Sequence, residues 1–254
     1  MSHTSTPLAV SLTAFLLTAF LLAAIPTPLA AGQIPRIAII IDDLGYQLVA
    51  GERVIALPGP VACAILPGVP RARELANAAN ARGKEVLLHL PMQAVGHQSR
   101  VEATRMTLDM SRSKFAAIFD AAIDSVPHAI GINNHRGSLL TRHPGHMQWL
   151  MEELLQRDGL FFVDSYTTHE SVALQIAAEL GVRAKKRDVF LDPDPGSEIL
   201  QREFERLKSV ARKRGSAIAI GHPHEATLAL LERELPLLAE QGFDLVPVSE
   251  LVAN

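Results

Sequence analysis

The feature that most constrains the fold of this chain is an alternation of short apolar runs with amphipathic stretches, which begins at Arg36. The apolar runs have the length and composition of strands, and the intervals show helical periodicity. The expected strands are 36–41, 61–66, 85–88, 130–133, 160–163, 189–191, 217–220 and 245–248. The expected helices are 71–82, 111–125, 147–157, 172–180, 198–213 and 227–241. This order predicts an α/β fold of seven or eight βα units around a parallel sheet or barrel.

The chain has 254 residues, of which 48% are hydrophobic and 20% charged, a composition typical of a core-forming globular protein. Glycines that could end helices in a left-handed conformation follow most of the expected helices, at Gly83, Gly159, Gly181, Gly215 and Gly242. No Pro/Ser-rich or like-charge tract divides residues 32–254. We therefore expect this part of the chain to form one domain.

The first 31 residues have the pattern of a targeting segment. No Lys, Arg, Asp or Glu precedes Arg36, the run 8–25 is almost wholly apolar, and small residues follow at 30–32. This pattern predicts a cleaved signal peptide, with an uncleaved N-terminal membrane anchor as the alternative. Both interpretations place the remaining chain outside the cytoplasm, either periplasmic or secreted in a bacterium or tethered to the inner membrane.

Several classes of function are disfavoured by composition and motif content. The net charge is −3, without a Lys/Arg cluster interleaved with aromatic residues, which argues against nucleic-acid binding. The single cysteine, Cys63, excludes an internal disulfide framework and a Cys-rich zinc site, and its apolar surroundings predict a buried thiol. The chain lacks a G-x-S-x-G elbow and a phosphate-binding glycine loop, so Ser138 and Ser165 are not expected to be nucleophiles.

Polar side chains follow the expected strands where they end. Because the carboxyl ends of parallel strands meet at one mouth, we expect six side chains to converge there: Asp42, Asp43, His89, His135, Asp164 and His222. Adjacent carboxylates repel each other unless a cation or a shared proton relieves the repulsion. Histidines supply the neutral nitrogen ligands that zinc prefers. The pattern therefore favours a metal centre over six unrelated structural residues.

Six segments carry a family resemblance: Ile41–Gly45, Gly83–Met92, Gly131–Ser138, Phe162–Ser165, Arg187–Asp192 and Ile218–Pro223. Together they resemble the divergent polysaccharide deacetylases, distant relatives of the NodB-type carbohydrate esterases, over residues 35–252. The resemblance implies a distorted (β/α) barrel and a bound divalent metal, with zinc favoured.

The resemblance also implies roles for individual residues. Asp42 matches the catalytic base and Asp43 a metal ligand of the paired-aspartate motif. His89 matches the first histidine of the second motif and is the second expected ligand. His222 matches the catalytic acid, and Asp164 resembles the carboxylate that orients this acid.

The third metal ligand departs from the family pattern. The second histidine of the usual motif would fall at Gln93, and the glutamine amide is a poor zinc ligand. His135 is the preferred replacement, with His97 and His224 as alternatives. Asp192 follows a later strand and is placed at the mouth without an assigned role.

These implications lead to two hypotheses. The first is a metal-dependent hydrolase that removes acetyl groups from an envelope or extracellular polysaccharide, such as a peptidoglycan-type glycan. The second is an accessory protein that binds metal or glycan without turnover, an interpretation motivated by Gln93. Release of acetate from an N-acetylated glycan separates the two.

Overall fold

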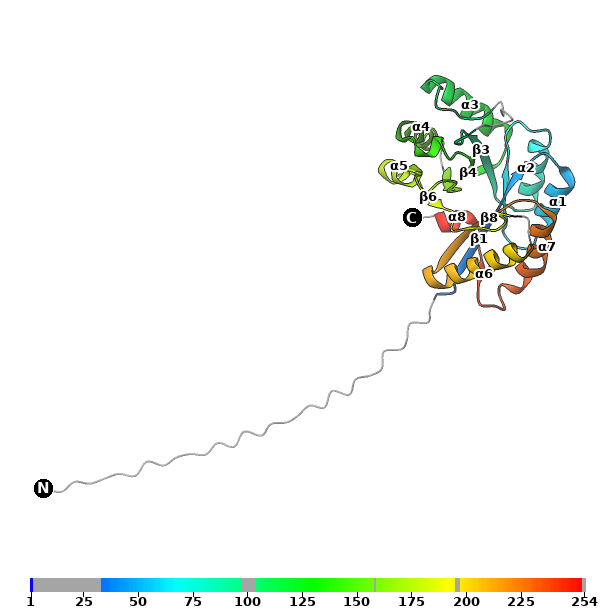
Figure 1. Cartoon of the computed structure of the whole chain (residues 1–254), viewed down its shortest axis with the longest axis vertical. Coiled ribbons are helices and arrows are strands. Elements are labelled where there is room, and N and C mark those ends of the chain that lie inside the picture. The colour runs from blue at the N-terminus through cyan, green and yellow to red at the C-terminus, as the bar shows by residue number, and fades with distance from the viewer. Residues whose placement is uncertain (2–32, 97–103, 158, 195–196, 253–254) are drawn as a thin grey trace. The chain divides into compact units, whose positions relative to one another are not determined.

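The computed structural model describes residues 1, 33–96, 104–157, 159–194 and 197–252, in which strands and helices alternate (Figure 1). The strands are β1 Arg36–Leu44, β2 Ala62–Ile65, β3 Val86–Met92, β4 Ala129–Arg136, β5 Phe161–Asp164, β6 Ala184–Lys186, β7 Val189–Phe190, β8 Ser216–Gly221 and β9 Asp244–Leu245. The α-helices are α1 Leu48–Ala56, α2 Ala72–Ala81, α3 Arg112–Ser125, α4 Pro144–Leu155, α5 Ala173–Leu180, α6 Ser197–Arg214, α7 Glu225–Glu234 and α8 Val248–Val252. Two 3₁₀ helices are η1 Leu140–Arg142 and η2 Leu235–Leu237.

The parallel sheet has the order β6-β5-β4-β3-β2-β1-β8-β7, and β9 pairs with the start of β1. Its two edge strands follow each other in the chain, separated only by Arg187 and Asp188. A flat sheet of eight strands would be about 34 Å wide, whereas the connection from Lys186 to Val189 spans at most about 11 Å. The sheet must therefore curl until its edges lie close together, which confirms the expected distorted (β/α) barrel.

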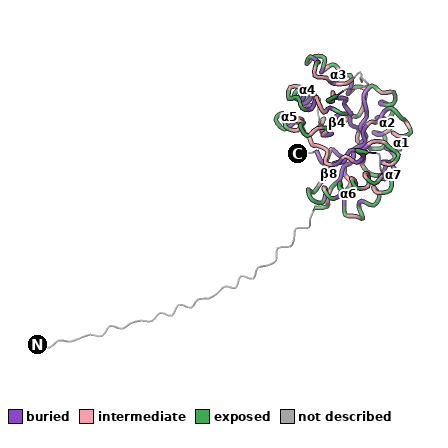
Figure 2. The backbone as a smooth tube through the Cα atoms, viewed as in Figure 1, coloured by how far each residue is buried: buried purple, intermediate pink, exposed green. Residues whose placement is uncertain are grey.

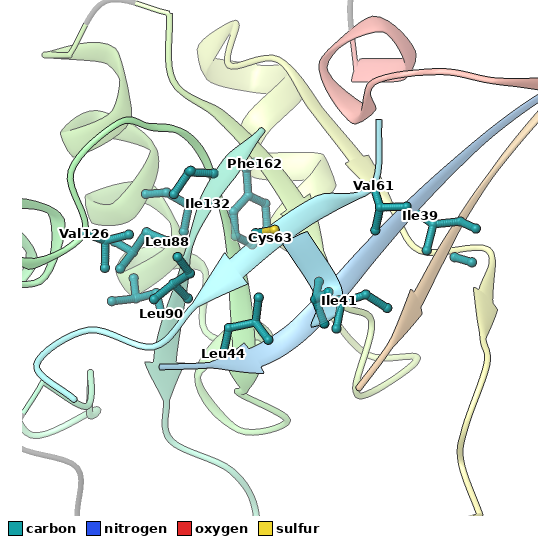
Figure 3. Packing of buried hydrophobic residues seen from close by; sticks show 14 of the residues in the cluster. Ile39, Ile41, Leu44, Val61, Cys63, Leu88, Leu90, Val126, Ile132 and Phe162 are labelled. Atoms are coloured by element: carbon teal, nitrogen blue, oxygen red, sulfur yellow. The ribbon is translucent and has the colours of Figure 1, made fainter. Parts of the chain in front are cut away.

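The central strands are buried on both faces and contribute to two separate cores. The larger core joins their outer faces to the surrounding helices; Ile39, Ile41, Cys63, Leu88 and Phe162 belong to it (Figure 3). The smaller core contains only strand residues and the C-terminal segment 246–252, so it fills the interior of the curled sheet. The outer surfaces of the helices are exposed, while the strands are buried (Figure 2).

Helix α8 closes the amino-terminal end of the barrel. The Glu85 carboxylate, one residue before β3, accepts hydrogen bonds from the backbone N–H of Val248 (2.7 Å) and Ser249 (3.3 Å). At the other end of α8, Lys185 Nζ donates to the carbonyl of Leu251 at 3.0 Å. These contacts satisfy backbone N–H and C=O groups that have no partner within the helix at its two termini.

The structure differs from the sequence expectations at three elements. Strand β6 and helices α1 and α8 were not expected. The run 245–248, expected as one strand, is divided between the end of β9 and the start of α8. The expected leader, residues 1–31, lies outside the described residues apart from Met1, and its role stays a prediction. Within the described residues, no helix is long and apolar enough to cross a lipid bilayer.

Gly131 provides a test of the interior packing. A Cβ atom at Gly131 would lie 2.5 Å from the ring of Phe161, which is 1% exposed and belongs to the smaller core. We expect Gly131→Ala to lower the free energy of unfolding by about 1–3 kcal/mol because overpacking displaces neighbouring groups. Denaturant unfolding measures this change. Gly145→Ala in α4 is the matched control, since its Cβ would meet only His143 at 3.7 Å, and it should not destabilise the protein.

Candidate active site

The site is built on the inner faces of the strands at their carboxyl ends. Side chains alternate between the two faces of a strand, so residues two apart share a face. Asp42 follows the inner-core residue Ile40, His89 follows Leu87, and His222 follows Ile220 at this spacing. On β4, Asn133 and His135 share the inner face with Gly131, which is in register with the inner-core residue Phe161. The chain therefore directs these polar groups into one space above the interior core.

A β-bulge explains how both consecutive aspartates reach this space. In a regular strand, Asp42 and Asp43 would point to opposite faces. Instead, the pairing of β1 with β2 shifts between Ile41 and Leu44, and Asp43 has a left-handed backbone with φ of 60°. A bulge of this kind inserts one residue and re-aims a side chain.

Three donor atoms from different strands form a compact triangle. Asp43 Oδ1 lies 3.1 Å from His89 Nε2 and 2.9 Å from His135 Nδ1, and the two imidazole nitrogens are 3.1 Å apart. Although Asp43 Oδ1 is buried, it has no hydrogen-bond partner of suitable geometry among the described residues. Tetrahedral zinc ligands at about 2.0–2.1 Å from the ion lie about 3.3 Å from one another. The donor set and its spacing therefore fit a zinc-type cation.

Asn133 fixes the orientation of the His89 ring. The Asn133 amide donates from Nδ2 to Asp42 Oδ1 at 2.7 Å, which leaves its Oδ1 as an acceptor for His89 Nδ1 at 2.9 Å. In its neutral form, His89 therefore carries its proton on Nδ1 and presents the Nε2 lone pair to the triangle. Such outer hydrogen bonds set the tautomer of a metal-binding histidine.

The two aspartates have different electrostatic environments. Burial raises the pKa of Asp42, which is 3% exposed, and the nearby His89, His222 and Asn133 only partly offset this effect. Burial would also raise the pKa of Asp43, but His135 and His89 hold that pKa well below its ordinary value. The Asp43 carboxylate therefore stays ionised to lower pH than the Asp42 carboxylate, and Asp42 is the better proton acceptor of the two.

His222 lies on the other side of the aspartate pair and is held by Asp192. Its Nδ1 donates to Asp192 Oδ1 at 2.9 Å, and its backbone N–H donates to Asp192 Oδ2 at 2.7 Å. Thr227 Oγ1 donates to the same Oδ2 at 2.8 Å. Burial lowers the pKa of His222, but the hydrogen bond to Asp192 and the charges of Asp42, Asp192 and Asp43 raise it to about 9. The imidazole is consequently protonated at neutral pH.

The expectation that Asp164 orients His222 is wrong. Asp164 accepts hydrogen bonds from Ser171 Oγ (2.6 Å) and from the backbone N–H of Tyr166 (2.8 Å). The physical reason is strand alternation: Val163 faces the interior, so Asp164 lies on the opposite face of β5. Asp164 orders the loop that follows β5, and Asp192 takes the orienting position.

Neither Gln93, at the usual ligand position, nor the alternative His224 joins the triangle. Gln93 uses its side-chain Oε1 to accept a hydrogen bond from the Leu108 N–H at 2.9 Å, which ties together two loops. His224 is the N-cap residue of α7 and groups with His222 and Asp192 instead. His97 lies outside the described residues. Among the described residues, the structure brings His135 together with Asp43 and His89.

A cavity of about 380 Å³ opens over the site. Its lining includes Asp42, His89, His135 and His222, and also Arg136, Tyr166 and Arg187, to which the sequence analysis gave no role. Asn133 was likewise given no role, although its position two residues before His135 could have indicated the shared strand face. Arg136 and Tyr166 carried no such signal, because their left-handed backbones, with φ of 58° and 52°, break the strand pattern.

The pairing of His222 with Asp192 predicts a pH effect in the metal-free protein. We expect Asp192→Asn to lower the pKa of His222 from about 9 by about 1 or more, because a charged acceptor is lost. Asp164→Asn is the matched control and should leave this pKa unchanged. NMR titration of the His222 ring in the presence of a chelator measures both.

The sign of the accompanying stability change follows from the direction of the pKa shift. A histidine whose pKa is raised by folding stabilises the folded state most at pH values below 6.5, and this contribution is lost as the pH rises to about 9. The stability difference between wild type and Asp192→Asn should therefore shrink from pH 6 to pH 10. An equal response of His222 to Asp164→Asn would contradict the assignment.

Comparison with known proteins agrees with this geometry. A family model described as divergent polysaccharide deacetylase matches residues 39–252. The uncharacterized protein YibQ of Escherichia coli K12 is 40% identical over 212 residues, which cover 84% of this chain and 65% of that protein, slightly less than two thirds of its length.

Two solved structures share the fold. Uncharacterized protein ATU2773 from Agrobacterium tumefaciens C58 is similar with a TM-score of 0.82 at 20% identity, covering 88% of this chain and 92% of that one. A mutant of BA3943 of Bacillus anthracis, described as a CE4 family pseudoenzyme with restored enzymatic activity, has a TM-score of 0.50 at 14% identity, over 87% of this chain and 69% of that one. Because the family model spans well over half of the sequence, the chain belongs to the divergent polysaccharide deacetylase family.

Proposed function

We propose that the protein is a metal-dependent hydrolase that removes acetyl groups from an envelope polysaccharide. One observation carries this proposal: the triangle of Asp43, His89 and His135 lies between a buried carboxylate and a protonated imidazole. His89 Nε2 is 3.6 Å from Asp42 Oδ2, and Asp43 Oδ2 is 3.9 Å from His222 Nε2. A proton acceptor and a proton donor thus flank the same donor set, as hydrolysis of an acyl group requires.

The triangle has the chemistry of a catalytic zinc site. Its three protein donors leave coordination positions for water and substrate. A divalent metal held there would polarise the acyl carbonyl and lower the pKa of bound water.

The chain's own residues account for both proton transfers. The Asp42 carboxylate takes a proton from the attacking water, and its raised pKa makes it a stronger base than an ordinary aspartate. The water oxygen bonds to the acyl carbon as the bond from that carbon to the leaving nitrogen or oxygen breaks. His222 gives its proton to the leaving atom from Nε2, while Asp192 holds Nδ1 and stabilises the imidazolium before the transfer. The products are acetate and the free amine or alcohol of the sugar.

The location outside the cytoplasm is part of the same proposal. It is supported by the apolar, uncharged segment 8–25 and by the small residues at 30–32. Mass spectrometry of the N-terminus of the protein isolated from its host distinguishes a cleaved signal peptide from a retained anchor.

Two substitutions separate metal binding from turnover. We expect Asp42→Asn to bind one equivalent of zinc with wild-type affinity and to lose acetate release by about 10²–10⁴-fold, because the proton acceptor is gone. His135→Ala should lose tight zinc binding, since it removes one corner of the triangle. Zinc titration and an acetate-release assay on N-acetylated peptidoglycan and chitin-type oligomers measure the two properties.

His224→Ala is the matched control for the ligand assignment, and it should bind zinc normally because His224 lies outside the triangle. Wild-type zinc affinity in His135→Ala would overturn the assignment. Binding of glycan without any metal-dependent release of acetate would favour the accessory-protein alternative instead.

A further inference from the structure

The cavity over the site has an uneven distribution of charge. Within the described lining, Asp42 is the only carboxylate, and it lies at the catalytic end. Two guanidinium groups, of Arg136 and Arg187, belong to the same lining. Lys186 adds a third cation nearby, with its Nζ 4.0 Å above the ring of Tyr166. The wall beyond the catalytic groups is therefore electropositive.

The two guanidinium groups differ in how many hydrogen bonds they make within the protein. Arg187 Nε donates to the carbonyl of Ser165 at 2.8 Å, and its Nη2 donates to the carbonyl of Tyr166 at 3.3 Å. It is thereby tied to the loop after β5. Arg136 is exposed, and its guanidinium has no hydrogen bond or ion pair with any residue that the structure describes. Of the two guanidinium groups that line the cavity, that of Arg136 is thus the one free to bind a ligand.

The backbone holds Arg136 in an unusual conformation. Its φ of 58° is left-handed, which is unfavourable for a non-glycine residue. The Arg136 carbonyl accepts hydrogen bonds from Asn134 Nδ2 at 2.6 Å and from Thr167 Oγ1 at 2.9 Å, and these contacts maintain the conformation. Gly137 follows with φ of 92°, and a Cβ there would crowd Met92 at 3.1 Å. The backbone of this turn is therefore held in place, while the Arg136 guanidinium stays available to a ligand.

We propose that Arg136 binds a carboxylate on the sugar chain, so that the substrate is an acidic, N-acetylated glycan. This inference rests on the proposed function and names the class of its substrate. A guanidinium matches a carboxylate in a bidentate geometry. A carboxylate needs only the one lining guanidinium that has no partner in the described part of the chain, whereas a phosphate monoester carries about −1.5 to −2.

Binding of matched oligosaccharides tests the proposal. The zinc-loaded full chain carrying Asp42→Asn, which does not turn over substrate, is titrated calorimetrically with three tetrasaccharides. One alternates N-acetylglucosamine with N-acetylmuramic acid, the second is the same chain with its carboxylates reduced to alcohols, and the third is N-acetylglucosamine only. We expect the acidic chain to bind about 10-fold or more tightly than the other two at low salt, because a charge-assisted hydrogen bond is stronger than a neutral one. The preference should diminish as salt is added.

Arg136→Gln in the same background should abolish the preference for the acidic chain, and Arg136→Lys should keep part of it. The matched control is Arg142→Gln, which removes one positive charge from an exposed pair with Glu170 that does not line the cavity. This control should bind all three chains as before. Equal binding of the acidic and reduced chains, an unchanged preference in Arg136→Gln, or binding of none of the chains would each overturn the proposal.

Acetate release by the wild-type protein, measured in parallel, separates this proposal from the proposed function. Preferential binding through Arg136 without acetate release would support acidic-glycan recognition and refute hydrolysis. Equal acetate release from all three chains, unaffected by Arg136→Gln, would refute the recognition of a carboxylate and leave the hydrolase standing.

Discussion

The β-bulge at Asp42 and Asp43 is the constraint on which the site depends. Without it, one of the two carboxylates would point into the outer core. The bulge places both on the inner side, where Asp43 meets two imidazoles and Asp42 meets an amide. The left-handed backbone at Asp43 is unfavourable for a non-glycine residue, and such conformations gather at functional sites. The neighbouring strands β2 and β8 are buried apart from Ser216, so the packing of both cores maintains this geometry.

The titratable groups of the site fall into two sets, one suited to binding a cation and one suited to transferring protons. The low pKa of Asp43 and the lone pair on Nε2 of neutral His89 favour the binding of a cation at the triangle. The raised pKa of Asp42 and the raised pKa of His222 prepare an acceptor and a donor of protons. The pKa values of the two neighbouring aspartates thus shift in opposite directions, because Asp42 is buried beside an amide and Asp43 lies between two imidazoles.

The sequence allowed the barrel, most of its strands and the convergence of five of the six expected site residues to be predicted. Each of these rests on a strong local signal, namely an apolar run that ends in a polar residue. The role of Asp164 could not be predicted because β5 is buried on both faces, so no alternation of polar and apolar residues shows which way each side chain points. The short strand β6, Ala184–Lys186, lacked an apolar run altogether. Helix α8 is only five residues long, which is too short to show helical periodicity.

Helix α8 has a consequence for the way a polymer can reach the catalytic groups. It seals the amino-terminal end of the barrel with Glu85 and Lys185 at its two termini, and apolar side chains fill the interior above it. The sugar chain proposed as substrate therefore cannot thread through the barrel as through a pore. It has to lie across the open mouth, and a chain that approaches sideways needs no free end, so units in the middle of a long strand of glycan are as accessible as those at its tips.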